Sequence, residues 1–177
     1  MAANRYNPAT HPWNPPMNDG VHFQSRLPLA WQTESKQSPF EAARFLDVLG
    51  AIEHVGDDTP DPRDAKLDLQ LVWLARLLTP ALPPSVEARI GIEHAVWFQA
   101  QPLPSGARGW VGFSPSDTLP FLLSLPAQII ACEPSGSGGH RVAARWIIED
   151  QMLREALERM VFRHHREQIR RKREAGL

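Results

Sequence analysis

This chain of 177 residues has little cysteine, no long apolar run and no excess of charge of either sign. Its one cysteine, Cys132, excludes an internal disulfide and a cysteine-based metal site. No apolar stretch approaches the ~18 residues that span a bilayer, and no basic start leads into an apolar run, so we expect no membrane helix and no secretory signal. With 19 basic and 20 acidic residues, the chain is not a globally basic nucleic-acid binder. These features predict a cytoplasmic protein.

Proline is abundant instead, with 17 residues, about twice the average usage. So many prolines exclude long helical arrays and indicate turns and strand ends. Several of them fall in residues 1–20, which also contain asparagines and lack apolar periodicity, so we expect a disordered proline-rich tail there. Residues 21–174 are enough for one domain with its own core.

Alternation of apolar and polar residues predicts a set of short strands. Residues 21–33 alternate, and Pro28 places that strand at an edge or a bulge. Residues 86–98 begin with the same alternation, and residues 107–113 predict another strand. The remaining strand signals lie at 125–133 and 140–148 on either side of a glycine-rich turn, and they predict a hairpin.

Helical spacing of apolar residues predicts three helices, over residues 39–55, 62–78 and 149–174. The second of these is apolar nearly all round, so it needs more than one partner surface. Either it is buried within its own domain or a second copy of the chain covers the rest. The hypothesis of self-association assigns the contact to four leucines at coiled-coil spacing: Leu67, Leu71, Leu74 and Leu78.

No catalytic signal accompanies these elements. The nucleophile elbow, the phosphate-binding loop and the zinc-protease motif are all missing from the sequence. The glycine-rich turn lacks the lysine and the helix that a phosphate cradle needs. The histidines are scattered, and the adjacent pair His164 and His165 points about 100° apart on a helix, so we expect no metal site. We therefore expect a protein that is not an enzyme.

The last predicted helix changes from apolar to basic along its length. We expect its apolar face to consist of Met152, Leu153, Ala156, Leu157, Met160, Val161 and Phe162. Seven lysines and arginines lie between Arg159 and Arg173, with Glu167 as the one acidic residue. Positive charge at a helix C-terminus is favoured by the macrodipole alone. The functional alternative is an anionic partner such as a nucleotide, a nucleic acid or an acidic protein face. Nucleic-acid binding is the weaker alternative, because no aromatic stacking array or reader motif accompanies the arginines.

The order of these elements resembles the atypical branch of the PilZ domain family. The first strand carries Ser25-Arg-Leu-Pro-Leu-Ala-Trp31, the later strands carry Leu125-Pro-Ala-Gln-Ile-Ile and Arg141-Val-Ala-Ala-Arg-Trp, and the arginine-rich helix follows at once. The resemblance implies an α+β fold, a small antiparallel PilZ-like β-barrel with two inserted helices and a long C-terminal helix, over residues 21–174. It also implies a bacterial receptor module for cyclic di-GMP, with inserted helices that mediate oligomerisation.

The resemblance also implies two nucleotide-clamping motifs, R-x-x-x-R before the first strand and D/N-x-S-x-x-G on a later one. Only Arg5 precedes the first strand here, and Ile92-Glu-His-Ala-Val-Trp occupies the region of the second motif. We therefore expect cyclic di-GMP binding to be absent, weak or dependent on a partner, and the module to act mainly through protein contacts as a homo-oligomer. If the ligand binds, five arginines are the candidates: Arg26, Arg141, Arg145, Arg163 and Arg166.

Overall fold

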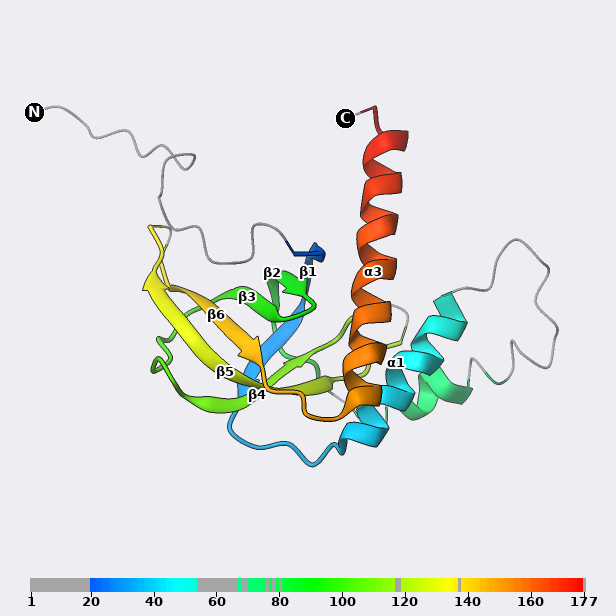
Figure 1. Cartoon of the computed structure of the whole chain (residues 1–177), viewed down its shortest axis with the longest axis horizontal. Coiled ribbons are helices and arrows are strands. Elements are labelled where there is room, and N and C mark those ends of the chain that lie inside the picture. Colours follow the sequence, from blue (N-terminus) through cyan, green and yellow to red (C-terminus); the bar gives the residue numbers. More distant parts are fainter. Residues whose placement is uncertain are drawn as a thin grey trace, which may run out of the picture.

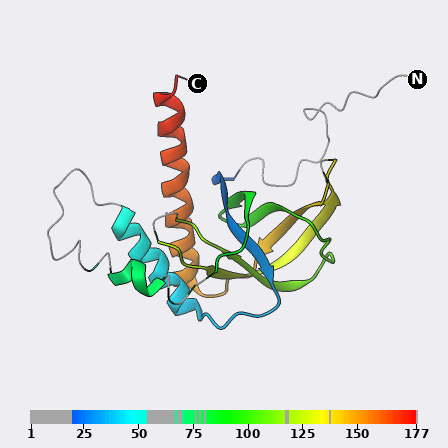
Figure 2. The ribbon, with the colours of Figure 1, turned by 180° about the vertical axis from the view of Figure 1, so that it is seen from behind.

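Six antiparallel strands form a closed barrel in the order β1-β2-β3-β6-β5-β4 (Figure 1). The computed structural model describes residues 20–53, 67, 70–75, 77, 79, 81–116, 119–136 and 138–176. The strands are β1 (His22–Gln32), β2 (Ser85–Gly91), β3 (His94–Gln99), β4 (Arg108–Phe113), β5 (Leu123–Pro134) and β6 (His140–Trp146). Helices α1 (Pro39–Glu53) and α3 (Gln151–Glu174) lie beside each other on one side of this barrel (Figures 1 and 2). The α+β barrel with a long C-terminal helix is thus confirmed.

Local capping explains where the two long helices begin. At α1, the Ser38 hydroxyl accepts a hydrogen bond from the Glu41 amide, and the Glu41 carboxylate accepts one from the Ser38 amide, so the two residues form a capping box. At α3, the Asp150 carboxylate accepts a hydrogen bond of 2.8 Å from the Leu153 amide. Since Asp150 has extended backbone angles, the helix begins at Gln151, two residues later than predicted.

Strand β1 changes partner at Pro28. From His22 to Pro28 it pairs with β2, and from Leu29 to Gln32 it pairs with β4. The prediction of a sheet edge was therefore wrong, because the barrel is closed and Pro28 lies where the strand turns from one neighbour to the other. A residue without an amide hydrogen fits this transition.

The barrel interior holds the side chains that alternate inward, among them Phe23, Leu27 and Trp97. Helix α3 covers the same core with its buried residues Leu153, Ala156, Leu157, Met160 and Val161. Full burial of such a side chain is worth about 1.5–3 kcal/mol, so α3 is an integral part of the core. The prediction of its apolar face was wrong at two positions, because Met152 and Phe162 are exposed.

Two other expectations need correction or fall outside the structure. Residues 86–98 contain two strands, β2 and β3, because the chain turns at Ile92 and Glu93. The helix predicted over 62–78 is described only in part, where Leu67, residues 70–75 and Leu77 are helical. Leu78 and the predicted tail up to residue 19 lie outside the described residues.

Candidate functional site

The five candidate arginines lie on three different parts of the fold. Arg26 is exposed on β1, opposite Glu87 of β2. Arg141 and Arg145 are on β6, which is three strands away from β1 in either direction round the barrel. Arg163 and Arg166 are on α3. Outward-facing side chains on opposite walls of a barrel point away from each other, so the structure does not bring these five guanidinium groups together.

Arg163 joins α1 to α3. Its Nε lies 3.0 Å from a carboxylate oxygen of Glu53, and the two side chains are only 15% and 23% exposed. A Cβ at Gly50 would lie 2.7 Å from Arg163 Nη1, so the missing side chain of Gly50 makes room for the guanidinium. Burial raises the pKa of Glu53, and the charge of Arg163 partly offsets that rise. This contact gives Arg163 a structural role between the helices.

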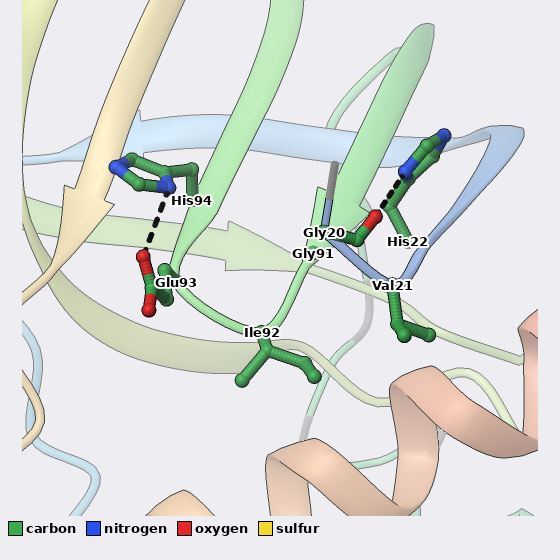
Figure 3. A pocket seen from close by; sticks show the side chains of 7 residues that line it. All are labelled: Gly20, Val21, His22, Gly91, Ile92, Glu93 and His94. Atoms are coloured by element: carbon green, nitrogen blue, oxygen red, sulfur yellow. Dashed lines mark hydrogen bonds and ion pairs between the residues drawn. The ribbon is translucent and has the colours of Figure 1, made fainter. Parts of the chain in front are cut away.

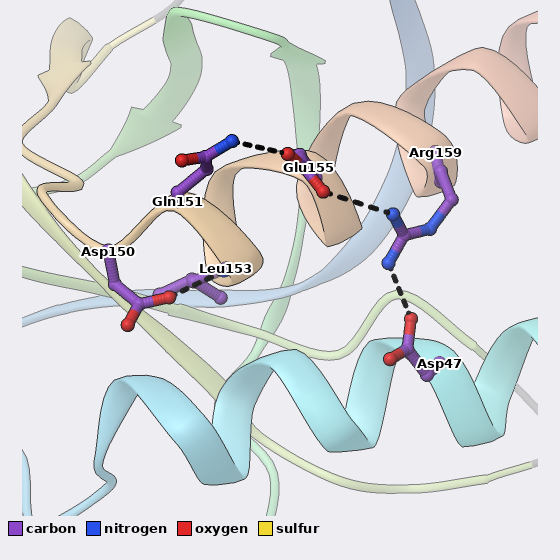
Figure 4. A network of polar contacts seen from close by, with 6 residues as sticks. All are labelled: Asp47, Asp150, Gln151, Leu153, Glu155 and Arg159. Carbon is purple, nitrogen blue, oxygen red and sulfur yellow. Dashed lines mark hydrogen bonds and ion pairs between the residues drawn. The ribbon is translucent and has the colours of Figure 1, made fainter.

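A second polar network joins the same two helices nearer their N-termini (Figure 4). Arg159 donates a 2.7 Å hydrogen bond to the Asp47 carboxylate of α1, and its other terminal nitrogen lies 4.0 Å from Glu155. Exposed Phe40 and Met152 border the same hollow, which measures about 280 Å³. All these groups are solvent-accessible, so the network orients the helices at a modest energetic contribution.

Helix α3 also completes the hydrogen bonding of β1, which the sequence did not reveal. Where β1 has β2 on one side only, His165 Nδ1 donates a 2.6 Å hydrogen bond to the His22 carbonyl. The Gln168 side-chain amide donates to the Gln24 carbonyl and accepts from the Gln24 amide, as a neighbouring strand would. Polar side chains at i and i+3 on a helix carry no distinctive signal, so only the tertiary structure shows this seam.

His164 lies on the same seam, stacked on Phe23 with ring centroids 4.6 Å apart. Burial, together with the charge of the nearby Arg163, lowers the pKa of His164 to about 4. The ring is therefore neutral near pH 7. In this environment His164 is a packing residue.

A small cleft lies at the barrel mouth, between the start of β1 and the turn from β2 to β3 (Figure 3). It measures about 140 Å³ and is lined by Gly20, Val21, His22, Gly91, Ile92, Glu93 and His94. His22 Nδ1 donates to the Gly20 carbonyl, and burial lowers the pKa of His94. This is the region where the resemblance places the second clamping motif. Among the described residues, the lining contains no arginine or lysine that could bind a phosphate.

Strands β2, β3 and β6 carry a cationic surface that includes Arg89, which the sequence reasoning missed. Arg89 pairs with Val96 of β3, which pairs with Ala143 of β6, between Arg141 and Arg145. Burial and the neighbouring Arg89 guanidinium lower the pKa of Arg141, while Glu133 partly opposes this change. The alternation of residues 86–91 was the available signal, because it places Arg89 on the outward face.

The helical segment around residue 74 presents large apolar side chains to solvent. Leu67 is 57% exposed, Leu71 38% and Leu74 54%, and Trp73 and Leu77 are also exposed. The opposite side of the segment packs inward, where Ala75 joins a buried cluster with Leu49 of α1 and Leu119. In the part of the chain that the structure describes, this face has no partner. Contiguous exposed apolar side chains of this kind mark interaction surfaces.

Two classes of site are not found among the described residues. No group of three or more histidine, cysteine, aspartate or glutamate side chains there could hold a metal ion. No helix in the same residues is long and apolar enough to cross a membrane.

The architecture is a closed six-stranded antiparallel barrel with a long C-terminal helix packed on its core. Residues 58–174 match the sequence model of the atypical PilZ domain, described as a cyclic di-GMP receptor. This match covers more than half of the chain, which therefore belongs to the atypical PilZ domain family. PilZ domains are non-catalytic receptor modules, so the chain is a cyclic di-GMP receptor-like signalling domain and not an enzyme.

One solved structure resembles the chain over most of its length. It is a pathogenic protein from Xanthomonas campestris, described as a new tetrameric PilZ domain self-assembled via an unusual helical bundle. The two sequences are 31% identical, the match covers 86% of this chain and 91% of the other, and the TM-score is 0.75. No curated protein matches the chain.

Proposed function

We propose that this PilZ domain signals through protein contacts, as a self-associating module that has lost the nucleotide clamp of its family. The exposed apolar face of the segment that contains Leu67, Leu71 and Leu74 carries this proposal, because it has the character of an interface. The Xanthomonas relative assembles through a helical bundle, which supports the same use of the helices here. Phe162 and Ile169 are two further exposed apolar side chains, and they lie on α3.

Light scattering during size-exclusion chromatography tests the assembly. We expect the parent chain to form a homo-oligomer and the Leu71→Glu/Leu74→Glu variant to dissociate, because each glutamate would have to lose its hydration in the interface. Phe98→Glu is the matched control, since it changes an exposed apolar residue on the barrel, 40% exposed, and should leave the mass unchanged. A monomeric parent chain would refute the proposal. So would a variant that unfolds instead of dissociating, because the segment would then belong to the private core.

The loss of the nucleotide clamp follows from the same geometry. The described lining of the cleft at the β2–β3 turn has no arginine or lysine, and Arg163 is engaged with Glu53. Two converging guanidinium groups would be the usual means of binding a cyclic dinucleotide. We expect isothermal titration of the isolated chain with cyclic di-GMP to show weak or no binding. Tight binding at a defined stoichiometry would contradict this part of the proposal.

The alternative of nucleic-acid binding through α3 has less support. Arg159 bonds Asp47, Arg163 bonds Glu53, and Arg170 and Arg171 lie against Glu167 of their own helix. These carboxylates compete with a phosphate backbone for the arginines. A gel shift at low salt, where phosphate contacts are strongest, should therefore show no retardation.

A further inference from the structure

The C-terminal half of α3 adds no buried residue to the hydrophobic core. The buried residues of this helix end at Val161, and every described residue after it is at least partly exposed. In both views the last turns of α3 extend beyond the strands of the barrel (Figures 1 and 2). At 1.5 Å per residue, residues 162–174 form about 20 Å of helix whose outer side is open to a partner.

One face of this half carries a regular pattern of apolar and cationic side chains. Phe162 and Ile169 are seven residues apart, and an arginine follows each of them by four residues, at Arg166 and Arg173. Residues three and four apart are neighbours on a helix surface, so the four side chains alternate along one stripe. All four are exposed, Phe162 by 42% and Ile169 by 37%. We call these four residues the α3 stripe.

The two arginines of the α3 stripe differ from their neighbours on the helix. Arg159, Arg163, Arg170 and Arg171 each have a carboxylate within 4.0 Å. Among the described residues, Arg166 and Arg173 form no ion pair of this kind. The macrodipole accounts for a cation in the last turn, but its effect does not reach Arg166, which lies about two turns earlier. Arg166 therefore serves neither the helix end nor the contact with α1.

The α3 stripe lies on turns that are already helical without a partner. Ion pairs between Glu167 and Arg171 and between Arg170 and Glu174 support these turns from within the helix. A surface formed in advance loses less conformational entropy on binding than a segment that must fold first. The stripe is therefore preorganised for binding.

We propose that the α3 stripe binds an amphipathic helix of a partner protein, on which apolar and acidic residues alternate at spacings of three and four. The apolar residues of that helix pack against Phe162 and Ile169, and its carboxylates pair with Arg166 and Arg173. Two helices that pack side by side keep seven-residue patterns of this kind in register along their contact. The complementary pattern on the partner is thus fixed by the four positions of the stripe.

A second copy of α3 is a poorer occupant than an acidic helix. Residues 166–174 contain five basic and two acidic residues, so two such segments would repel each other. A nucleic acid would match the charge, but its phosphates would leave Phe162 and Ile169 without apolar partners. An acidic amphipathic helix satisfies both halves of the pattern.

The inference rests on the proposed function, since it names the chemistry of a protein partner. It concerns α3 and not the segment around Leu71. Peptide binding at α3 and assembly through that segment are measured separately, so either can fail without the other.

Fluorescence polarisation with labelled peptides in about 0.1 M salt tests the inference. One probe is three repeats of Leu-Ala-Gln-Ala-Glu-Ala-Gln and the other is three repeats of Glu-Ala-Gln-Ala-Leu-Ala-Gln, so that each of the two possible helix directions has a matching pattern. The control is three repeats of Leu-Ala-Glu-Ala-Gln-Ala-Gln, which has the same composition but places glutamate on the opposite face from leucine. We expect one of the probes to bind at least about tenfold more tightly than the control, since one charged hydrogen bond is worth about that factor. A control that binds as tightly as both probes, or no binding of either probe, would overturn the inference.

Paired arginine variants locate the binding on the stripe. Arg166→Gln/Arg173→Gln should weaken the better probe at least about tenfold. The matched control Arg26→Gln/Arg108→Gln removes the same charge from exposed positions of the barrel and should change the affinity less than about twofold, because salt screens distant charges. Circular dichroism verifies that both variants fold. Equal losses in the two variants would overturn the inference.

The apolar half of the pattern has its own test. Phe162→Ala/Ile169→Ala should weaken the better probe at least about tenfold, because the leucines of the peptide lose the side chains against which they pack. Unchanged affinity would show binding by charge alone and would overturn the proposed helix packing. Displacement of the probe by single-stranded DNA or by phosphatidylserine vesicles at lower concentration than by unlabelled probe would also overturn the inference.

Discussion

The ion pair between Arg163 and Glu53 allows a sharp test of how α3 is attached to α1. In the variant Arg163→Met, the long apolar stem still fills the space beside Gly50, but the Glu53 carboxylate loses its partner. Because the Glu53 side chain is only 23% exposed, water cannot fully replace the guanidinium. The substitution therefore isolates the electrostatic cost of an unpaired, largely buried carboxylate.

The expected magnitude follows from the degree of burial. Removal of one partner from a fully buried ion pair costs about 3–5 kcal/mol of unfolding free energy. Since some solvent reaches both side chains here, we expect Arg163→Met to lose about 2 kcal/mol near neutral pH. Adding Glu53→Gln removes the stranded charge, so the double variant should lie within about 1 kcal/mol of the parent chain.

The stability loss of Arg163→Met should depend on pH through the ionisation of Glu53. Burial raises the pKa of Glu53, and Arg163 partly offsets that rise, so without Arg163 the pKa of the carboxyl becomes higher still. A carboxyl whose folded pKa is raised contributes stability below its unfolded pKa, about 4.3, and loses it as pH rises through the folded pKa. The deficit of Arg163→Met should therefore shrink as the pH is lowered from about 7 to about 5.

Urea unfolding monitored by circular dichroism and tryptophan fluorescence measures these differences. Arg166→Met, an exposed position on the same helix, is the matched control and should change stability by less than about 0.5 kcal/mol. Three results would each refute the reasoning: a stable Arg163→Met variant, a double variant as unstable as the single one, or a deficit that does not vary with pH.

Three further predictions concern the barrel and its seam with α3. Gln168→Ala should lower the free energy of unfolding by about 1–2 kcal/mol. It should also speed amide hydrogen exchange at Gln24, because the Gln24 amide loses its hydrogen-bond acceptor. Unchanged exchange would contradict the hydrogen bonding between α3 and β1. His164 should titrate near pH 4 by NMR. Because its pKa is lowered in the folded state, its contribution to stability should fall as the pH drops below about 6.5. A titration near pH 6.5 would show that the ring is exposed to water and would contradict its burial. Gly109→Ala should destabilise the barrel by more than about 2 kcal/mol in thermal or urea unfolding, because the new Cβ would lie 2.6 Å from the Gln32 carbonyl oxygen. Gly20→Ala, where no atom lies within 4 Å of the new Cβ, should cost less than about 0.5 kcal/mol, and equal losses in the two variants would contradict the close approach at Gly109.

Local pattern was sufficient to predict most elements of the fold. The alternation in residues 21–33 and the helical spacing in residues 39–55 and 149–174 report side-chain direction directly, so β1, α1 and α3 were expected near their observed bounds. The turn at Ile92 was not expected, because it lacks proline and follows Gly91 without a second turn residue. Single-residue burial was also less certain, as the exposed Met152 and Phe162 show.

By itself, the sequence determined the family resemblance, the absence of both clamping motifs and the apolar character of the segment around Leu71, since each is a property of local residue order. Only the tertiary structure decided what each arginine does, because pairing depends on contacts between residues far apart in the chain. Arg163 is engaged by Glu53, more than one hundred residues earlier. Arg89 and Arg141 approach across two strand boundaries, and Arg26 lies on β1, three strands away from Arg141 round the barrel. Strand order and helix docking place these charges, and neither is encoded in the spacing of arginines along the chain.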